Sequence, residues 1–167
     1  EEFRMPKHTR DIKDALVRII QEESPISLDL LYRQTLKAFG TRATAKSIER
    51  IDNILSDMGY PITDEDGKFF IYGDEPERAV TFYRYPSKEC KREGSDIPFS
   101  EIRLAIKDVV MRQVSLPKDM LASEVQKIFG YARGNEELSK RIESVLGQGK
   151  IEGIIKDETG NYTAVQS

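Results

Sequence analysis

Hydrophobic residues recur every three or four positions in three stretches of the first half of the chain, and polar residues fill the positions between them. This spacing is typical of amphipathic helices. The three stretches are 9–23, 27–39 and about 43–58. The pattern then changes to two short apolar runs on either side of an acidic turn at 64–67, which predicts a β-hairpin. Three helices and a hairpin, with Pro25-Ile26 available for a short strand between the first two helices, is the order of a winged helix-turn-helix.

Local signals mark the ends of these helices. Thr9 or His8 stands where the first helix would be capped, and Ser27 is placed to cap the second. Gly40 is expected to end the second helix and Gly59 the third, because glycine readily adopts the left-handed conformation that ends many helices.

The second half of the chain repeats the first. At an offset of 90 residues, 11–16 aligns with 101–106 and 38–40 with 128–130, and after a slip of one residue Arg50 aligns with Arg141. Slips of this size belong in loops, where insertions are tolerated. The repeat predicts a helix over 101–112 capped by Ser100, helices over 118–129 and 135–146, and a hairpin formed by 151–155 and 161–165.

We therefore expect a mainly α protein with small β elements, of the α+β class, built as tandem winged helix-turn-helix domains with three helices and a β-hairpin wing in each. The boundaries that the repeat implies are 1–78 for the first domain, 79–99 for an inter-repeat strand and linker, and 100–167 for the second domain. Residues 79–85 are expected to form that strand and to pack on a wing or between the domains, because their aromatic content is too high for a free tether.

Composition narrows the function classes. Hydrophobic residues make up 38% and charged residues 33% of the sequence, as in an ordinary globular protein, and no apolar run approaches a membrane span. The sequence has one cysteine, Cys90, and one histidine, His8, so neither an internal disulfide nor a His-rich metal site is expected. The chain begins at Glu1 without a signal-like apolar region, so we expect a piece of a longer, cytoplasmic protein.

The net charge of −3 limits which partners the protein can bind through electrostatic attraction. A nucleic-acid binder that works alone usually carries a basic excess, because much of its affinity comes from neutralising phosphates. This sequence has none, so any nucleic-acid contact has to come from a local surface.

Several short motifs resemble a known family. The segments 29–33, 39–42, 83–86 and 96–105 are similar to an uncharacterised carboxyl-terminal region of large bacterial proteins. In that family the region follows a superfamily-one DNA/RNA helicase ATPase and a restriction-endonuclease-like segment. The resemblance covers nearly the whole chain. It implies a nucleic-acid-processing context and carries over no catalytic residue. The second repeat departs from the motif, because its arginine, Arg133, is displaced by one position.

The third helix supplies candidate nucleic-acid contacts, because the outward side chains of this helix enter the major groove in a helix-turn-helix. Arginine and lysine suit phosphate or guanine, and asparagine suits adenine. The candidates in the first repeat are Arg42, Lys46, Arg50 and Asn53. Glu49 and Asp57 lie on the same side, so an ordinary solvated surface with local charge pairs is the alternative.

The candidates in the second repeat are Arg133, Lys140 and Arg141. Here Glu137 takes the place of Lys46. The two surfaces therefore differ, and if one copy alone binds DNA, we expect it to be the first.

The hairpin tips and the inter-repeat segment offer further candidates. Asp64, Glu65 and Asp66 would repel a phosphate backbone, which fits either a protein-facing wing or a soluble turn. A strip of aromatic and basic residues could stack on unpaired bases or pack between the domains. The strip is Phe82, Tyr83, Arg84 and Tyr85.

The sequence thus favours a non-catalytic accessory module of a DNA helicase- or nuclease-like protein, whose winged helices contact or position DNA. The alternative is a protein-protein or intramolecular docking module that does not touch nucleic acid. No catalytic residue, metal site or cofactor is expected. The expected partners are DNA and the rest of a helicase-like parent chain, with no membrane and no small-molecule substrate.

Overall fold

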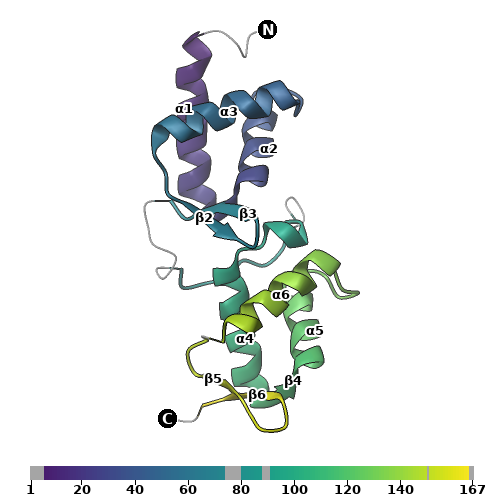
Figure 1. Cartoon of the computed structure of the whole chain (residues 1–167). Coiled ribbons are helices and arrows are strands. Elements are labelled where there is room, and N and C mark those ends of the chain that lie inside the picture. Colours follow the sequence, from purple (N-terminus) through teal and green to yellow (C-terminus); the bar gives the residue numbers. More distant parts are fainter. Residues whose placement is uncertain (1–5, 74–79, 88–90, 150, 166–167) are drawn as a thin grey trace. The chain divides into compact units, whose positions relative to one another are not determined.

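The computed structural model describes residues 6–73, 80–87, 91–149 and 151–165 (Figure 1). The chain divides into two compact units, one ending at residue 76 and the other beginning at residue 77. Within the described ranges there are six α-helices and two three-stranded antiparallel sheets, which confirms the α+β class. No helix in those ranges is both long and apolar enough to cross a membrane.

The first unit has three helices and one small sheet. Its helices are α1 (Pro6–Glu23), α2 (Leu28–Ala38) and α3 (Ala45–Met58), and its strands are β1 (Ile26–Ser27), β2 (Ile62–Glu65) and β3 (Lys68–Ile71). The strand order is β1-β3-β2. Asp66 and Gly67 join β2 to β3 with φ values of 57° and 85°, the left-handed conformation that a two-residue hairpin turn requires.

The core of the first unit lies between one side of each helix and the inner face of the sheet. α1 contributes Ile12, Leu16 and Ile20, α2 contributes Leu31 and Leu36, α3 contributes Ile51 and Leu55, and the sheet contributes Ile26 and Ile71. Burial of each such side chain stabilises the unit by about 1.5–3 kcal/mol. The helical spacing of these residues in the sequence is therefore the pattern that builds the unit.

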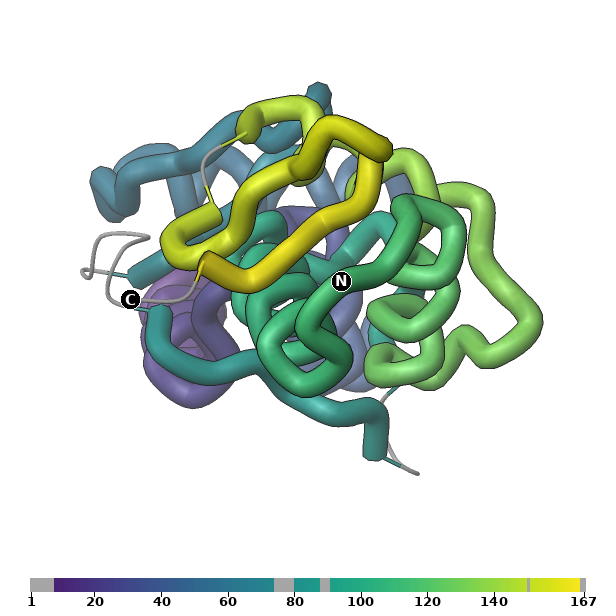
Figure 2. The backbone as a smooth tube through the Cα atoms, turned by 90° about the horizontal axis from the view of Figure 1, so that it is seen from below, coloured from purple at the N-terminus to yellow at the C-terminus, as the bar shows by residue number. Residues whose placement is uncertain are grey.

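The second unit repeats this order of elements. It comprises a short 3₁₀ turn η3 (Gly94–Asp96), the helices α4 (Phe99–Gln113), α5 (Lys118–Ile128) and α6 (Glu136–Gln148), and the strands β4 (Ser115–Pro117), β5 (Ile154–Lys156) and β6 (Asn161–Ala164). The strand order is β4-β6-β5, and Figure 2 shows the yellow hairpin beside the green segment that holds β4. The second core is centred on Ile102, Ile106, Leu121, Val125, Ile142 and Val145.

Three helix ends that the sequence predicted are confirmed, and two are wrong. Gly40, with φ 62°, follows Phe39, the cap at the end of α2. The Ser27 hydroxyl accepts the Leu30 amide at 3.1 Å and caps α2, and Gly59 ends α3 with φ 74°. α1 begins at Pro6, ahead of both His8 and Thr9, because proline suits the first turn of a helix, where its missing N–H costs nothing. Ser100 lies inside α4, whose cap is Pro98.

The inter-repeat segment (80–87 and 91–98) is part of the second unit rather than a separate linker. The strand expected over 79–85 is wrong for the described residues 80–85, which form no strand. Residue 79 lies outside the described ranges. Tyr83 packs against the core of the second unit, and Ile97 is a member of that core. The segment is held by side chains rather than by a β-ladder.

Candidate nucleic-acid interface

α3 presents a polar surface because its sequence fixes both its start and its orientation. The Thr44 hydroxyl accepts the Ser47 amide at 3.1 Å, and the Ser47 hydroxyl accepts the Thr44 amide at 2.8 Å, which forms a capping box. Ile51 and Leu55 turn the apolar side into the core. The opposite side is therefore solvent-facing, and Lys46, Glu49 and Asn53 are exposed on it.

The structure brings three of the four first-repeat candidates together. A shallow depression of about 570 Å³ is lined by Thr9, Lys46, Glu49, Arg50, Asn53 and Ile54. Arg50 does not project freely into solvent, because its Nη2 donates to the Thr9 hydroxyl at 3.0 Å and ties α3 to α1. Arg42 is exposed in the loop before α3. We call Arg42, Lys46, Arg50 and Asn53 the α3 surface.

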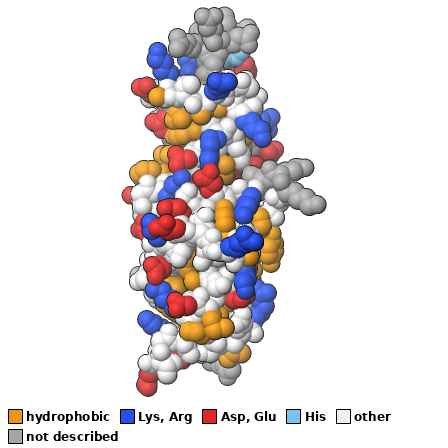
Figure 3. Space-filling view, turned by 90° about the vertical axis from the view of Figure 1, so that its right-hand side faces the viewer, with side chains coloured by type: hydrophobic (Ala, Val, Ile, Leu, Met, Phe, Trp, Pro, Cys, Tyr) orange, Lys and Arg blue, Asp and Glu red, His pale blue; other side chains and the backbone are white. Residues whose placement is uncertain are grey.

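Carboxylates limit the positive potential of the α3 surface. Glu49 lines the same depression, and Asp57 is exposed near the end of the helix. Asp52 accepts the Tyr32 hydroxyl at 2.5 Å. Burial of Tyr32, together with this hydrogen bond and the charge of Asp52, raises the pKa of the tyrosine. Figure 3 shows both lysine or arginine and aspartate or glutamate side chains on the face drawn.

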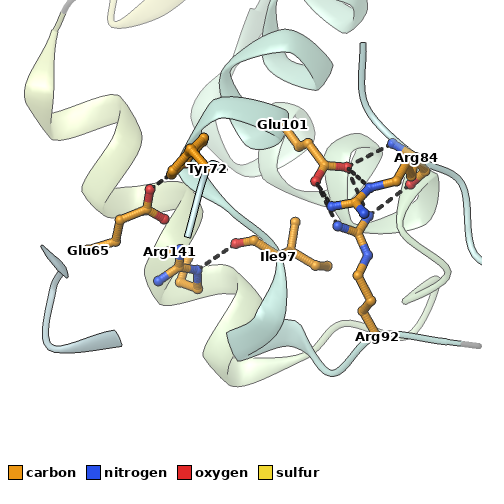
Figure 4. A network of polar contacts seen from close by, with 7 residues as sticks. All are labelled: Glu65, Tyr72, Arg84, Arg92, Ile97, Glu101 and Arg141. Atoms are coloured by element: carbon orange, nitrogen blue, oxygen red, sulfur yellow. Dashed lines mark hydrogen bonds and ion pairs between the residues drawn. The ribbon is translucent and has the colours of Figure 1, made fainter. Parts of the chain in front are cut away.

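The second-repeat candidates do not form an equivalent surface. The prediction that Arg141 faces outward is wrong, because this side chain is 6% exposed. Its Nε donates to the Ile97 carbonyl at 2.8 Å (Figure 4), and its guanidinium lies 4.2 Å from the centre of the Phe99 ring. Arg141 therefore secures the segment before α4 to α6.

The other two second-repeat candidates are solvent-exposed, but one of them is neutralised. The Lys140 ammonium lies 3.4 Å from Glu136 and 3.9 Å from Glu137, one turn earlier on α6. Arg133 is exposed in the loop before α6. Nearby glutamates thus balance the charge of Lys140, the exposed cation of α6. For Lys46 on α3, no ion pair is seen within the described residues.

The first hairpin tip is acidic, as predicted, but only in part. Asp64 and Asp66 are exposed, whereas Glu65 is buried and accepts the Tyr72 hydroxyl at 2.6 Å (Figure 4), so the prediction of an exposed Glu65 is wrong. The alternation of a strand explains this, since β2 continues to Glu65 and turns this side chain to the face opposite Asp64. At the other end of the turn, Lys68 pairs with Asp29 at 2.6 Å, so its charge is also balanced.

The aromatic strip of the inter-repeat segment is divided between anchors and exposed rings. The Tyr83 hydroxyl donates to Asp108 at 2.6 Å, and the Tyr83 ring packs edge-on against Phe129 with centroids 6.0 Å apart. Burial and the hydrogen bond to Asp108 raise the pKa of Tyr83. Phe82 and Tyr85 are 68% and 67% exposed. Tyr83 and Arg84, which contacts Glu101, therefore hold the segment, whereas Phe82 and Tyr85 are exposed to solvent.

Sequence reasoning missed the residue that organises this segment, Glu101. Its carboxylate is 1% exposed and lies between the guanidinium groups of Arg84 and Arg92 (Figure 4), with shortest distances of 2.7 and 2.8 Å. Arg92 also donates to the Arg84 carbonyl at 3.0 Å. Burial alone would raise the pKa of Glu101, but the hydrogen bonds and charges of the two arginines outweigh it and lower the pKa. The helical spacing of the sequence could have indicated its burial, because Glu101 falls on the apolar side of α4 with Ala105.

The described residues hold no group of three His, Cys, Asp or Glu side chains that could bind a metal ion. Cys90 lies outside the described ranges. No protein family, curated protein sequence or solved structure matches this chain. Function therefore has to be inferred from the local chemistry of these surfaces.

Proposed function

We propose that each unit is a winged helix, and that the first unit is a non-catalytic nucleic-acid-binding module of a helicase- or nuclease-like protein, with α3 as the contact helix. The order helix, strand, helix, helix, hairpin supports the fold assignment in both units, as does the sheet order in which the last strand lies between the first and the hairpin partner. In proteins of this architecture the third helix enters the major groove.

The difference between α3 and α6 is the observation that carries the proposal. The exposed groups of the α3 surface include Arg42, Lys46 and the Asn53 amide, which match phosphate and base-edge chemistry. On α6, Glu137 takes the place of Lys46, Lys140 is paired with glutamates, and Arg141, the counterpart of Arg50, is buried, whereas Arg133 is exposed like Arg42.

The proposed contact is small and of modest affinity. Arg42 and Lys46 bind phosphates, and Asn53 faces a base edge, whereas the acidic tip of the first hairpin stays away from the backbone. If two or three phosphates are neutralised, the logarithm of the binding constant should fall linearly with the logarithm of the salt concentration. The expected slope is about −2 to −3. The overall charge of −3 adds a repulsive background, so we expect binding mainly at low salt.

Fluorescence anisotropy with labelled duplex and single-stranded DNA, titrated at several salt concentrations, tests this function. The double variant Arg42→Glu, Lys46→Glu should weaken duplex binding by about tenfold or more, since each reversed charge removes one phosphate contact and adds a repulsion. The matched control is Arg133→Glu, Lys140→Glu in the second unit, which should change the affinity less than about twofold. Absence of salt-dependent binding, or an equal loss in both double variants, would refute the proposal.

A docking module without nucleic-acid contact is the second candidate, and the exposed Phe82 and Tyr85 favour it. Both rings lie on a segment that Tyr83 and Arg84 fix to the second unit, so the rings are presented at little entropic cost. Replacing both with alanine should abolish co-purification with a co-expressed helicase-like parent segment if the surface is a docking site. If the rings instead stack on bases, the same variant loses affinity for single-stranded DNA and keeps its affinity for duplex.

A further inference from the structure

The second unit contains a cavity that the proposed function does not use. It lies between the carboxyl end of α6 and the hairpin β5–β6 and has a volume of about 630 Å³. Its apolar lining consists of Leu146 and Tyr162, which are nearly inaccessible to solvent, the half-buried Ile151 and Ile154, and the exposed Ile155. Cavities of this size with apolar walls are typical of small-molecule sites.

Gly147 lines this cavity without adding a side chain to it. It is the penultimate residue of α6, where glycine weakens the helix relative to alanine. A Cβ placed on Gly147 would meet no atom within 4 Å, so packing does not require glycine here. Its φ is not in the left-handed region, unlike that of Gly149, which ends the helix with φ 66°. Neither packing nor backbone conformation therefore requires a glycine at this exposed position.

The rim of the cavity is charged and has an excess of cations. Lys118 pairs with Glu143 at 2.8 Å, and both side chains are about half exposed. Lys156 is the third charged residue that lines the cavity, and its ammonium lies 6.0 Å from the centre of the Tyr162 ring. Among the described residues that line the cavity, Lys156 is the charged residue for which no ion pair is seen. This combination suits a ligand that has one negative group at the end of an apolar body.

We propose that the cavity binds a small amphipathic carboxylate. The aromatic or branched aliphatic body of the ligand packs against Leu146, Ile154 and Tyr162, and its carboxylate pairs with Lys156. Gly147 admits the body beside the last turn of α6. This inference is independent of the DNA contact proposed for the first unit, and the result of either experiment leaves the other open.

Titration of the ¹⁵N-labelled 167-residue chain with 4-phenylbutyrate, followed by amide chemical shifts, tests the site. We expect saturable shifts around Leu146, Gly147, Ile154 and Tyr162 with a dissociation constant on the order of 1 mM, the range that a ligand of this size reaches in a partly open cavity. The neutral probe 4-phenylbutanamide has nearly the same shape and should bind about threefold to fivefold more weakly, because it loses the pairing with Lys156. Unsaturable or scattered shifts, or equal binding of both probes, would overturn the proposal.

Two variants separate the cavity from a general effect of charge. Lys156→Glu should weaken binding of the carboxylate and leave binding of the amide unchanged. The matched control is Lys127→Glu on α5, which does not line the cavity and should alter neither. Gly147→Leu fills the wall and should abolish binding of both probes while α6 stays folded, as checked by its amide shifts. The smaller change Gly147→Ala should raise the melting temperature and reduce binding, and undiminished binding in both Gly147 variants would also overturn the proposal.

Discussion

Glu101 illustrates how a single buried charge fixes a long segment of the second unit. A carboxylate removed from water is costly unless it is paired and hydrogen-bonded. Arg84 and Arg92 satisfy both oxygens, and Arg84 also donates its backbone amide at 2.8 Å. The three groups form one network, so loss of the carboxylate would leave two guanidinium groups facing each other.

Replacing this carboxylate with an amide should therefore destabilise the second unit. We predict that Glu101→Gln lowers its free energy of unfolding by about 3 kcal/mol, the usual cost of breaking a buried ion pair from one side. Native-state hydrogen exchange of amides in α4 and α5 measures this for the second unit separately. The control is Glu124→Gln, which removes an exposed partner of Lys127 and should cost less than about 0.5 kcal/mol. Similar losses in the two variants would contradict the central role of Glu101.

The pH dependence of this stability follows from the direction in which folding shifts the pKa of Glu101. The pKa of Glu101 in the folded chain is below its ordinary value of 4.5, because the two arginines outweigh the effect of burial. The folded state therefore binds the proton less readily than the unfolded state, and stability falls as the pH drops below about 4.5 toward the folded pKa. Wild-type protein should show this loss between neutral and acid pH in the same exchange measurement. Glu101→Gln should show a smaller loss, and an equal one would refute the assignment.

Val114 is a strained residue whose side chain gains little from its position. It ends α4 with φ 69° and ψ −50°, a conformation that is unfavourable for a β-branched residue, and it is 54% exposed. Val114→Gly should stabilise the second unit by about 1 kcal/mol, because glycine adopts positive φ without strain. The control Gln113→Gly, one residue earlier within the helix, should destabilise it by about 0.5–1 kcal/mol. Thermal unfolding followed by circular dichroism distinguishes the two, and a loss of stability in both would show that the strain is absent.

At the scale of elements, the start of α6 depends on a residue from the inter-repeat segment. Gly94 lies so close to the cap of α6 that a Cβ there would be 2.2 Å from the Asn135 side-chain oxygen. That oxygen accepts the Leu138 amide at 2.9 Å and caps the helix. The close approach explains why the segment and the helix fit only when residue 94 has no side chain.

A double-mutant cycle tests this fit. We predict that Gly94→Ala destabilises the second unit by about 2 kcal/mol, since it displaces the cap, and that Asn135→Ala costs about 1 kcal/mol, since it removes the cap. The double variant should cost about 1 kcal/mol less than the sum, because the two changes disrupt the same contact. Urea unfolding provides the three values, and strict additivity would show that Gly94 acts elsewhere.

Elements with strong periodicity could be predicted from the sequence, whereas contacts between distant elements could not. α3 was placed well because Ile51 and Leu55 define its buried side and Gly59 its end. Arg50 and Arg141 align in the repeat, yet one donates to a threonine on α1 and the other is buried against Phe99. Helical projection gives the direction of a side chain, but it does not show which neighbour covers it. Projection therefore placed the exposed Lys46 and Asn53 correctly, but it could not foresee the contact of Arg50 with Thr9 or the burial of Arg141.

At the scale of the whole molecule, the duplication conserves the framework and changes the surfaces. Both units have the same order of elements and the same sheet order. Lys46 on α3 is exposed and has no ion pair among the described residues, whereas the exposed Lys140 on α6 is paired with glutamates. The second unit also has the cavity and the exposed Phe82 and Tyr85. These differences favour a division of roles between the copies over two equivalent binding sites.

The repeat alone would start the second domain at residue 100, whereas the second compact unit starts at residue 77. A fragment of residues 100–167 keeps Glu101 and Arg141 but lacks Arg84, Arg92 and the Ile97 carbonyl, so both buried charges lose their partners. It also loses Ile97 and Tyr83 from the core.

We therefore predict that fragment 77–167 unfolds cooperatively and has dispersed amide resonances, and that fragment 100–167 has neither property. The missing interactions amount to several kcal/mol, which is comparable to the whole stability of so small a domain. A third fragment, 77–167 with Phe82→Ala and Tyr85→Ala, controls for length and surface aromatics and should fold like the first, because these rings are exposed. If fragment 100–167 were as stable as fragment 77–167, the anchoring role of the inter-repeat segment would be wrong.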